Sequence, residues 1–138
     1  MRLEHLNIKV NNIEDSVRFY QTVFPNWKVR GEGMWSVNGK PGRWLHIGDD
    51  FQYLTLNAND ENKHHHFENQ PIGLSHFAFE VSDLQGIVSR LQQAGYEPSG
   101  QGAESDHRTN IYFRDPSGFE IEFVQYHSNE ISERNYYG

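Results

Sequence analysis

Apolar and polar residues alternate at the start of the chain, and the same pattern returns near its middle. The stretch LEHLNIKV begins at Leu3 and the stretch LSHFAFEV begins at Leu74, so His5 aligns with His76 at an offset of 71 residues (76 − 5 = 71). Such alternation predicts a strand with one buried face. A helical spacing of apolar residues follows each stretch, so the sequence predicts an internal repeat of strand and helix.

Two amphipathic helices are expected. The first begins at Asn12, with Asp15 three residues later as in a capping box, and the second begins at Ser82, with Gln85 in the corresponding place. The second helix ends at Gly95. The apolar faces comprise Ile13, Val17, Tyr20 and Phe24 in the first helix and Leu84, Ile87, Val88 and Leu91 in the second. Each face is one-sided, so each helix should lie against a sheet.

About three runs of strand-forming residues follow each helix, and turn signals separate them. In the first half these signals are Asn38-Gly39, Pro41-Gly42 and Gly48-Asp49-Asp50. In the second half, Asp115-Pro116-Ser117-Gly118 predicts a type I turn that closes a hairpin. The predicted order in each half is therefore strand, helix and three strands.

This order divides the chain into a first βαβββ unit at residues 1–59, a polar linker at 60–72, a second unit at 73–127 and a tail at 128–138. We expect a single domain of the α+β class, in which the two tandem units form a curved, partly closed mixed sheet with the site in its concavity. The linker contains the run His64–His66, and three adjacent histidines cannot all face one site on a strand or helix.

Composition narrows the classes of function. There is no cysteine, so a metal would bind through imidazole, carboxylate, phenolate or water. The net charge of −7 and the isoelectric point near 5.5 argue against nucleic-acid binding, as does the scatter of Lys and Arg. The apolar runs are too short to span a membrane, and the N-terminus lacks the apolar core of a signal peptide. A cytoplasmic location is expected.

Strand parity brings candidate metal ligands to one face. His5, Asn7 and Lys9 share a face of the first strand, and His76 holds the equivalent place in the second unit. If the units pack about a pseudo-two-fold axis, the two histidines converge, and Glu122 lies on a face that can join them. Two imidazoles and one carboxylate leave coordination positions open on a divalent metal. These ligands suit Fe, Mn, Ni, Co and Zn and do not choose among them.

The paired units, the opening EHLNIKV and the closing NIYFRDPSGFEIEFVQY resemble the vicinal oxygen chelate superfamily over nearly the whole chain. That superfamily includes glyoxalase I, type I extradiol dioxygenases, fosfomycin-resistance enzymes and bleomycin-binding proteins. The most specific piece of the resemblance is the hairpin from Tyr112 to Glu122. The resemblance implies that His5, His76 and Glu122 are metal ligands.

Glyoxalase I resembles this layout but adds a fourth ligand, a glutamate on the last strand of its first unit. The matching stretch FQYLTLN places Tyr53 there or, after a slip, Thr55, and neither is a carboxylate. The three-ligand set is instead similar to extradiol and fosfomycin-resistance enzymes, in which a tyrosine at the place of Tyr112 lies near the metal. Tyr112 is therefore expected to donate a hydrogen bond or proton to substrate, unless it only packs the hairpin. His107 is a second acid/base candidate because imidazole titrates near neutral pH.

Four further residues are candidates for substrate binding. Lys9 matches an arginine of glyoxalase I that holds an acidic substrate group, although a strand-end lysine can equally reach solvent. Asn7 shares its face, and Tyr53 can lie at the metal. Arg134 lies in a tail that can fold over the site or pack on a partner subunit.

These patterns and the resemblance predict a metal-dependent enzyme that binds a small oxygen-bearing substrate. The open reaction classes are a lyase or isomerase, a thiol transferase and an extradiol-type dioxygenase. A cytoplasmic homodimer is expected. The alternative is a metal-free small-molecule binding or sequestering protein of the bleomycin-resistance type.

Overall fold

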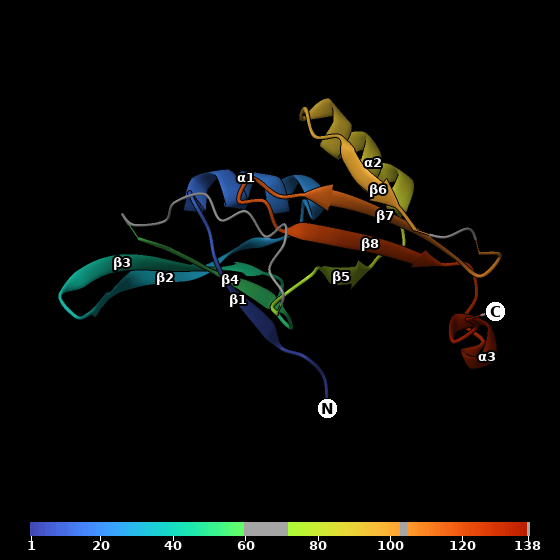
Figure 1. Cartoon of the computed structure of the whole chain (residues 1–138), viewed down its shortest axis with the longest axis horizontal. Helices are drawn as coiled ribbons and strands as arrows, with labels where there is room; N and C mark the ends of the chain where they lie inside the picture. The colour runs from blue at the N-terminus through green and yellow to red at the C-terminus, as the bar shows by residue number, and fades with distance from the viewer. Residues whose placement is uncertain (60–71, 103–104, 138) are drawn as a thin grey trace. The chain divides into compact units, whose positions relative to one another are not determined.

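The computed structural model describes residues 1–59, 72–102 and 105–137. They form two compact units, each built around a four-stranded mixed sheet, and each unit is described by itself (Figure 1). The elements are β1 (His5–Lys9), α1 (Ile13–Val23), β2 (Lys28–Val37), β3 (Lys40–Gly48) and β4 (Tyr53–Asn59), then β5 (Phe77–Glu80), α2 (Leu84–Gln93), β6 (Pro98–Gln101), β7 (Arg108–Arg114), β8 (Glu120–Tyr126) and α3 (Ile131–Arg134).

The two sheets have the same topology. The first has the strand order β1-β4-β3-β2 and the second has the order β5-β8-β7-β6. In each sheet the opening strand runs parallel to the last strand of its unit, and the other pairs are antiparallel. The predicted α+β fold of two βαβββ units is confirmed. The run His64–His66 lies outside the described residues.

Helix α1 begins as predicted, because the side chain of Asn12 accepts a hydrogen bond from the backbone N–H of Asp15 at 2.8 Å. Its buried face differs from the prediction: Val17 and Phe24 are only half-buried. The fully covered residues are Ile13, Ser16, Phe19, Tyr20 and Val23. This orientation of the helix buries the rings of Phe19 and Tyr20, which removes more apolar surface from water than burying Val17 would.

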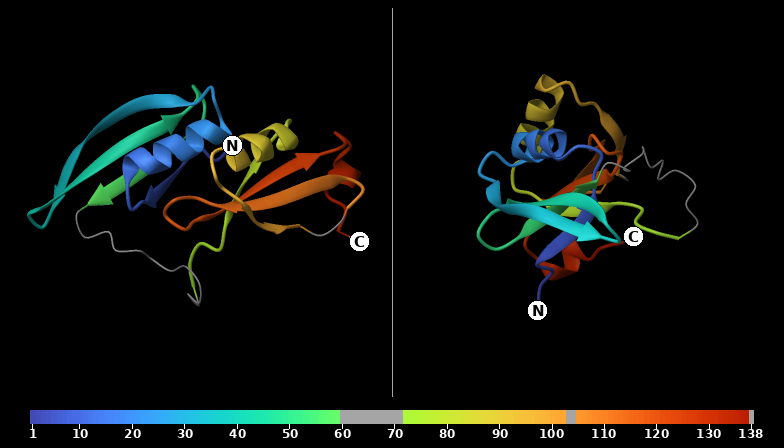
Figure 2. Two further views of the ribbon diagram at one scale, coloured as in Figure 1. Left: turned by 90° about the horizontal axis from the view of Figure 1, so that it is seen from above. Right: turned by 90° about the vertical axis from the view of Figure 1, so that its left-hand side faces the viewer.

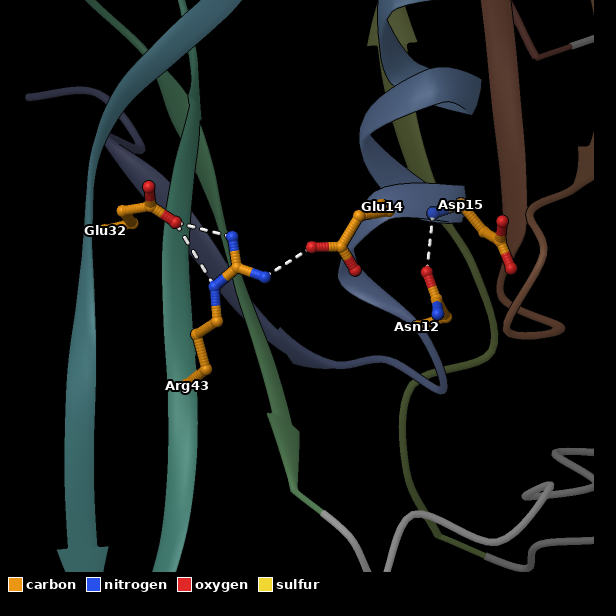
Figure 3. Close-up of polar contacts among 5 residues, drawn as sticks. All are labelled: Asn12, Glu14, Asp15, Glu32 and Arg43. Carbon is orange, nitrogen blue, oxygen red and sulfur yellow. Dashed lines mark hydrogen bonds and ion pairs between the residues drawn. The ribbon is translucent and has the colours of Figure 1, made fainter.

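Arg43 ties α1 to the sheet of the first unit (Figure 3). Its guanidinium, on β3, bonds to Glu14 in the first turn of α1 and to Glu32 on β2. The bond to Glu14 lowers the pKa of that carboxyl group. The guanidinium of Arg43 is therefore paired with two carboxylates, one on α1 and one on β2.

The β2–β3 hairpin is long and curved (Figure 2). Its turn is Asn38-Gly39, as predicted, and both residues have positive φ, at 52° and 76°. The predicted turn at Pro41-Gly42 is wrong, because both residues lie in β3. Pro41 is tolerated near the start of the strand, and Gly42 leaves room for the indole of Trp35. A Cβ at Gly42 would lie 2.1 Å from that ring.

The turn between β3 and β4 forms at the predicted place. The carboxylate of Asp49 accepts hydrogen bonds from the backbone N–H groups of Phe51 and Gln52, at 2.7 and 2.9 Å. This arrangement is an Asx-type turn, in which a side chain substitutes for a backbone acceptor.

Helix α2 begins one residue later than predicted. Asp83 caps it by accepting a hydrogen bond from the N–H of Gly86 at 2.9 Å, so Ser82 is not the cap. The N–H of Leu84 is taken by the side chain of Gln125 on β8, which fixes the helix start at this residue. The helix ends before Gly95, whose φ of 90° stops it as predicted. Leu84, Ile87 and Leu91 are buried as predicted, whereas Val88, the fourth residue of the predicted face, is only half-buried.

The β7–β8 hairpin closes at the predicted turn. The backbone N–H of Asp115 donates to Phe119 O at 2.9 Å, and the Asp115 carboxylate accepts from Phe119 N at 2.9 Å. On β8, Ile121 and Phe123 are fully buried, so Glu122 points to the other face of the sheet. Helix α3 lies just beyond the end of β8 (Figure 1). Within the described residues, no helix has the length and apolar character needed to cross a membrane.

Candidate functional site

Glu122 is the centre of a polar cluster on the sheet of the second unit. Its Oε2 atom lies 3.1 Å from Nε2 of His76, and its other oxygen, Oε1, accepts a hydrogen bond from the side-chain amide of Asn110. The side chain of Glu122 is only 12% exposed, whereas that of His76 is 39% exposed. Each oxygen of the carboxylate thus has a nitrogen partner, and the imidazole is the more exposed member of the pair.

Tyr112 joins this cluster from β7. It lies directly opposite Glu122 in the β7–β8 ladder, and its ring meets that of His76 edge-on, with centroids 5.5 Å apart. Burial raises the pKa of the Tyr112 phenol, and the negative charge of Glu122 and the hydrogen bond to it raise that pKa further. The phenol therefore stays protonated at neutral pH.

In the first unit, His5 stacks on the ring of Tyr53, with centroids 4.7 Å apart and an angle of 14° between the planes. Its Nδ1 atom lies 3.0 Å from Oε2 of Glu4. With Nδ1 donating to the carboxylate, Nε2 carries the lone pair that a metal would take.

Three further residues of this unit lie beside the His5–Tyr53 pair, and none of them was predicted as a site residue. The ring of His46 lies 4.6 Å from that of Tyr53, the indole of Trp44 lies 4.6 Å from that of His46, and the guanidinium of Arg30 lies 4.4 Å above Tyr53. Burial lowers the pKa of His46, and the charges of Arg30 and His5 lower it further. The alternation in WLHIG, which sets Trp44 and His46 opposite Leu45, was a usable signal.

Register identifies the first-unit counterpart of Glu122. Glu122 is paired with Ala78 on one side and Tyr112 on the other, whereas Thr55 is paired with Asn7 and His46. Because Asn7 aligns with Ala78 in the repeat, Thr55 rather than Tyr53 corresponds to Glu122. The place is therefore held by a buried hydroxyl and not by a carboxylate.

The substrate-binding candidates of the first unit lie near His5 on β1. The side-chain oxygen of Asn7 accepts a hydrogen bond from the amide of Asn57, whose own oxygen accepts from the indole N–H of Trp35 at 3.0 Å. Lys9 is exposed at the end of the strand. Asn7 thus belongs to a fixed polar chain, and Lys9 has a side chain that extends into solvent.

The candidates near the C-terminus are held within the second unit. Arg134 bonds to Glu80 at 2.7 Å, and its guanidinium lies 3.8 Å above the ring of Tyr126. The ring of His107 meets that of Tyr136 edge-on, with centroids 5.4 Å apart. The tail is therefore packed on its own unit, and Arg134 would have to leave Glu80 to reach a substrate.

A hollow of about 720 Å³ lies elsewhere in the second unit, beside the start of α2. Its lining includes Leu84, Thr109 and His127, and the hydroxyl of Thr109 lies 2.8 Å from Nε2 of His127. Neither His76 nor Glu122 lines this hollow. Asn110, which donates to Glu122, does line it, so the hollow adjoins the Glu122 cluster on the side of Asn110.

A divalent metal needs donors at short and defined distances. Two donors that each lie about 2.1 Å from one metal are roughly 3.0 to 3.4 Å apart. The His76–Glu122 separation of 3.1 Å falls in this range and is also an ordinary hydrogen-bond distance. Among the described residues, no group of three His, Asp or Glu side chains is gathered within a unit. His5 belongs to the first unit, and His76 and Glu122 belong to the second.

Comparisons with known proteins identify the family. Residues 2–123 match the Glyoxalase/Bleomycin resistance protein/Dioxygenase superfamily, and the chain belongs to this family. A lactoylglutathione lyase of Neisseria meningitidis is 29% identical over 96% of both chains. The metallothiol transferase FosB of Shouchella clausii is 27% identical over 96% of this chain and 83% of its own length.

Solved structures support the fold. A glyoxylase/bleomycin resistance protein/dioxygenase domain from Frankia sp. EAN1pec matches with a TM-score of 0.78 and 20% identity, over 99% of this chain and 98% of its own. The predicted membership of the vicinal oxygen chelate superfamily is therefore confirmed, and the chain is a distant relative of lactoylglutathione lyase and FosB.

Proposed function

We propose that the chain is a divalent-metal-dependent enzyme that binds a small oxygen-bearing substrate, with His5, His76 and Glu122 as the metal ligands. The contact between His76 and Glu122, at 3.1 Å, carries this proposal. Asn110 orients the carboxylate from behind, as outer-shell residues commonly orient metal ligands. The name of one relative, a metallothiol transferase, points the same way.

A bound metal, of the set Fe, Mn, Ni, Co or Zn, would polarise a substrate oxygen as a Lewis acid. Tyr112 holds its proton beside Glu122 and is the proposed donor to that oxygen. His107 is the second proposed acid/base group. Thr55 holds the first-unit position that corresponds to Glu122, so that position does not supply a carboxylate base.

The proposed substrate contacts are Lys9, Asn7, Tyr53 and Arg134. The names of the relatives favour a lyase or isomerase and a thiol transferase as reaction classes. Consumption of glutathione or another thiol would select the transferase, and oxygen uptake with a catechol would select an extradiol-type dioxygenase instead. We also propose a cytoplasmic homodimer, and sedimentation of the purified chain tests the dimer.

Metal titration of the chelator-treated chain tests the central proposal. The run His64–His66 should first be replaced by glutamine, because adjacent imidazoles bind the same metals. We expect uptake of about one metal ion per chain, and we expect His76→Ala and Glu122→Gln to abolish it. His127→Ala is the matched control, since His127 is bonded to Thr109 and should not affect uptake. No uptake, or equal uptake by all variants, would refute the proposal.

A metal-free binding protein is the second candidate. The His76–Glu122 contact is complete as a hydrogen bond, so a chain without metal would keep it. Ligands that raise the melting temperature with all metal removed, together with no metal uptake, would favour this function.

A further inference from the structure

A β-bulge places Arg30 over the ring of Tyr53. The β2–β3 ladder pairs Val29 with Ile47 and Gly31 with His46, so Arg30 is an extra residue opposed by no residue of β3. A bulge redirects the side chain of the extra residue and is frequent beside functional sites.

The N–H groups of the Arg30 guanidinium are available to bind a ligand. In the described part of the chain, the structure gives it no carboxylate or carbonyl partner, and its contact is the ring of Tyr53. Arg43 in the same sheet differs, because Glu14 and Glu32 occupy it. A planar fork of N–H donors fits the two oxygens of a carboxylate or phosphonate group.

The surroundings of Arg30 are flat and aromatic. Gly33 has no side chain, and a Cβ there would lie 2.8 Å from Nε1 of Trp44, so the indole lies against β2. The ring of His46 lies between the rings of Trp44 and Tyr53. A ligand held by Arg30 would therefore lie beside imidazole and indole edges, and Trp44 is a natural fluorescence reporter.

We propose that Arg30, lying on Tyr53 and beside His46, forms an oxyanion subsite for a small carboxylate or phosphonate ligand. The subsite itself needs no metal. Its role as the holder of one end of the substrate rests on the proposed function, because Tyr53 contacts both Arg30 and the proposed metal ligand His5. Only the ring of Tyr53 separates Arg30 from His5, so the substrate would be a short molecule with an anionic end.

Anion titration of the full, chelator-treated chain tests the subsite. The probes are acetate and methylphosphonate, followed by tryptophan fluorescence and calorimetry, and their relative affinities separate a carboxylate from a phosphonate ligand. We expect Arg30→Gln to weaken binding of the preferred probe by about tenfold or more, as the loss of a charge-assisted hydrogen bond predicts. Arg18→Gln removes the same charge from α1, where Arg18 is paired with Asp15, and should leave affinity unchanged.

Three outcomes would overturn the subsite. The first is that the parent chain binds neither probe. The second is that Arg30→Gln binds the probe as tightly as the parent does. The third is that Arg30→Gln and Arg18→Gln lose affinity equally. Arg30 is exposed, so Arg30→Gln should fold, and urea unfolding checks this. Metal uptake, measured on the same samples, keeps the proposals apart: failed uptake with anion binding retained refutes only the metal site, and the converse refutes only the subsite.

Discussion

Tyr112 and Glu122 face each other across the β7–β8 ladder, and burial together with the negative charge of Glu122 raises the pKa of the phenol. In the metal-free chain, Tyr112 should therefore ionise above its ordinary pKa. Glu122→Gln removes the negative charge, so the pKa should fall but stay raised, because burial is the largest cause. Ultraviolet titration, with Tyr112→Phe subtracted, measures this pKa. An unchanged pKa in Glu122→Gln would contradict the contact.

Ser16 is fully buried in α1, and its hydroxyl has no hydrogen-bond partner among the described residues. Ser16→Ala should raise the free energy of unfolding by about 1 kcal/mol, since it relieves an unpaired buried hydroxyl and improves helix propensity. Ser89→Ala in α2 is the matched control, because Ser89 is only half-buried and tests propensity alone. Urea unfolding should show the larger gain for Ser16→Ala, and an equal gain would show that burial plays no part.

The contacts of Arg43 should make the free energy of unfolding depend on pH. The hydrogen bond from Arg43 lowers the pKa of Glu14, so its stabilising effect is present above the unfolded pKa and is lost as pH falls through the folded pKa. Arg43→Met should lower the free energy of unfolding at pH 7 by a few tenths to about 1 kcal/mol, because the groups are partly exposed.

The same difference between Arg43→Met and the parent should shrink in acid, below about pH 4, and in high salt. Urea unfolding across this pH range measures it. Arg18→Met provides the comparison, because its single bond to Asp15 lies within α1. A difference that stays constant across the pH range would exclude Glu14 and Glu32 as its source.

Gly42 should be intolerant of a side chain. In Gly42→Ala the new Cβ would meet the indole of Trp35, and displacing that ring would also break its bond to Asn57. We expect a loss of about 1 to 3 kcal/mol in the free energy of unfolding. Gly31→Ala is the control, because its Cβ would meet Trp44 at an ordinary 3.9 Å. Equal losses would mean that strand propensity, rather than the Trp35 contact, determines the cost.

Much of the fold could be predicted because it depends on local rules. Alternation places Ile121 and Phe123 inward and Glu122 outward, and the turn at Asp115 sets the register that brings Tyr112 opposite Glu122. The start of α2 could not be predicted, because two adjacent residues can cap a helix. The choice of Asp83 depends on Gln125, which is distant in sequence and occupies the N–H of Leu84.

The site was predicted less completely, because part of it depends on an irregular strand. The position of His76 follows from parity and the repeat, and that of Tyr112 was expected from the family resemblance. The structure places both beside Glu122. Arg30 could not be found in this way. Strict alternation has no place for an extra residue, and the bulge appears only once β2 is paired with β3.

The buried position of Thr55 limits how the two halves of this protein can diverge. Thr55 is 6% exposed, so a glutamate substituted there would lose most of its hydration. A buried charge of this kind is costly unless a cation compensates it. A second carboxylate at this place would therefore need a compensating cation, either a metal ion or a basic side chain, whereas the hydroxyl of threonine needs neither.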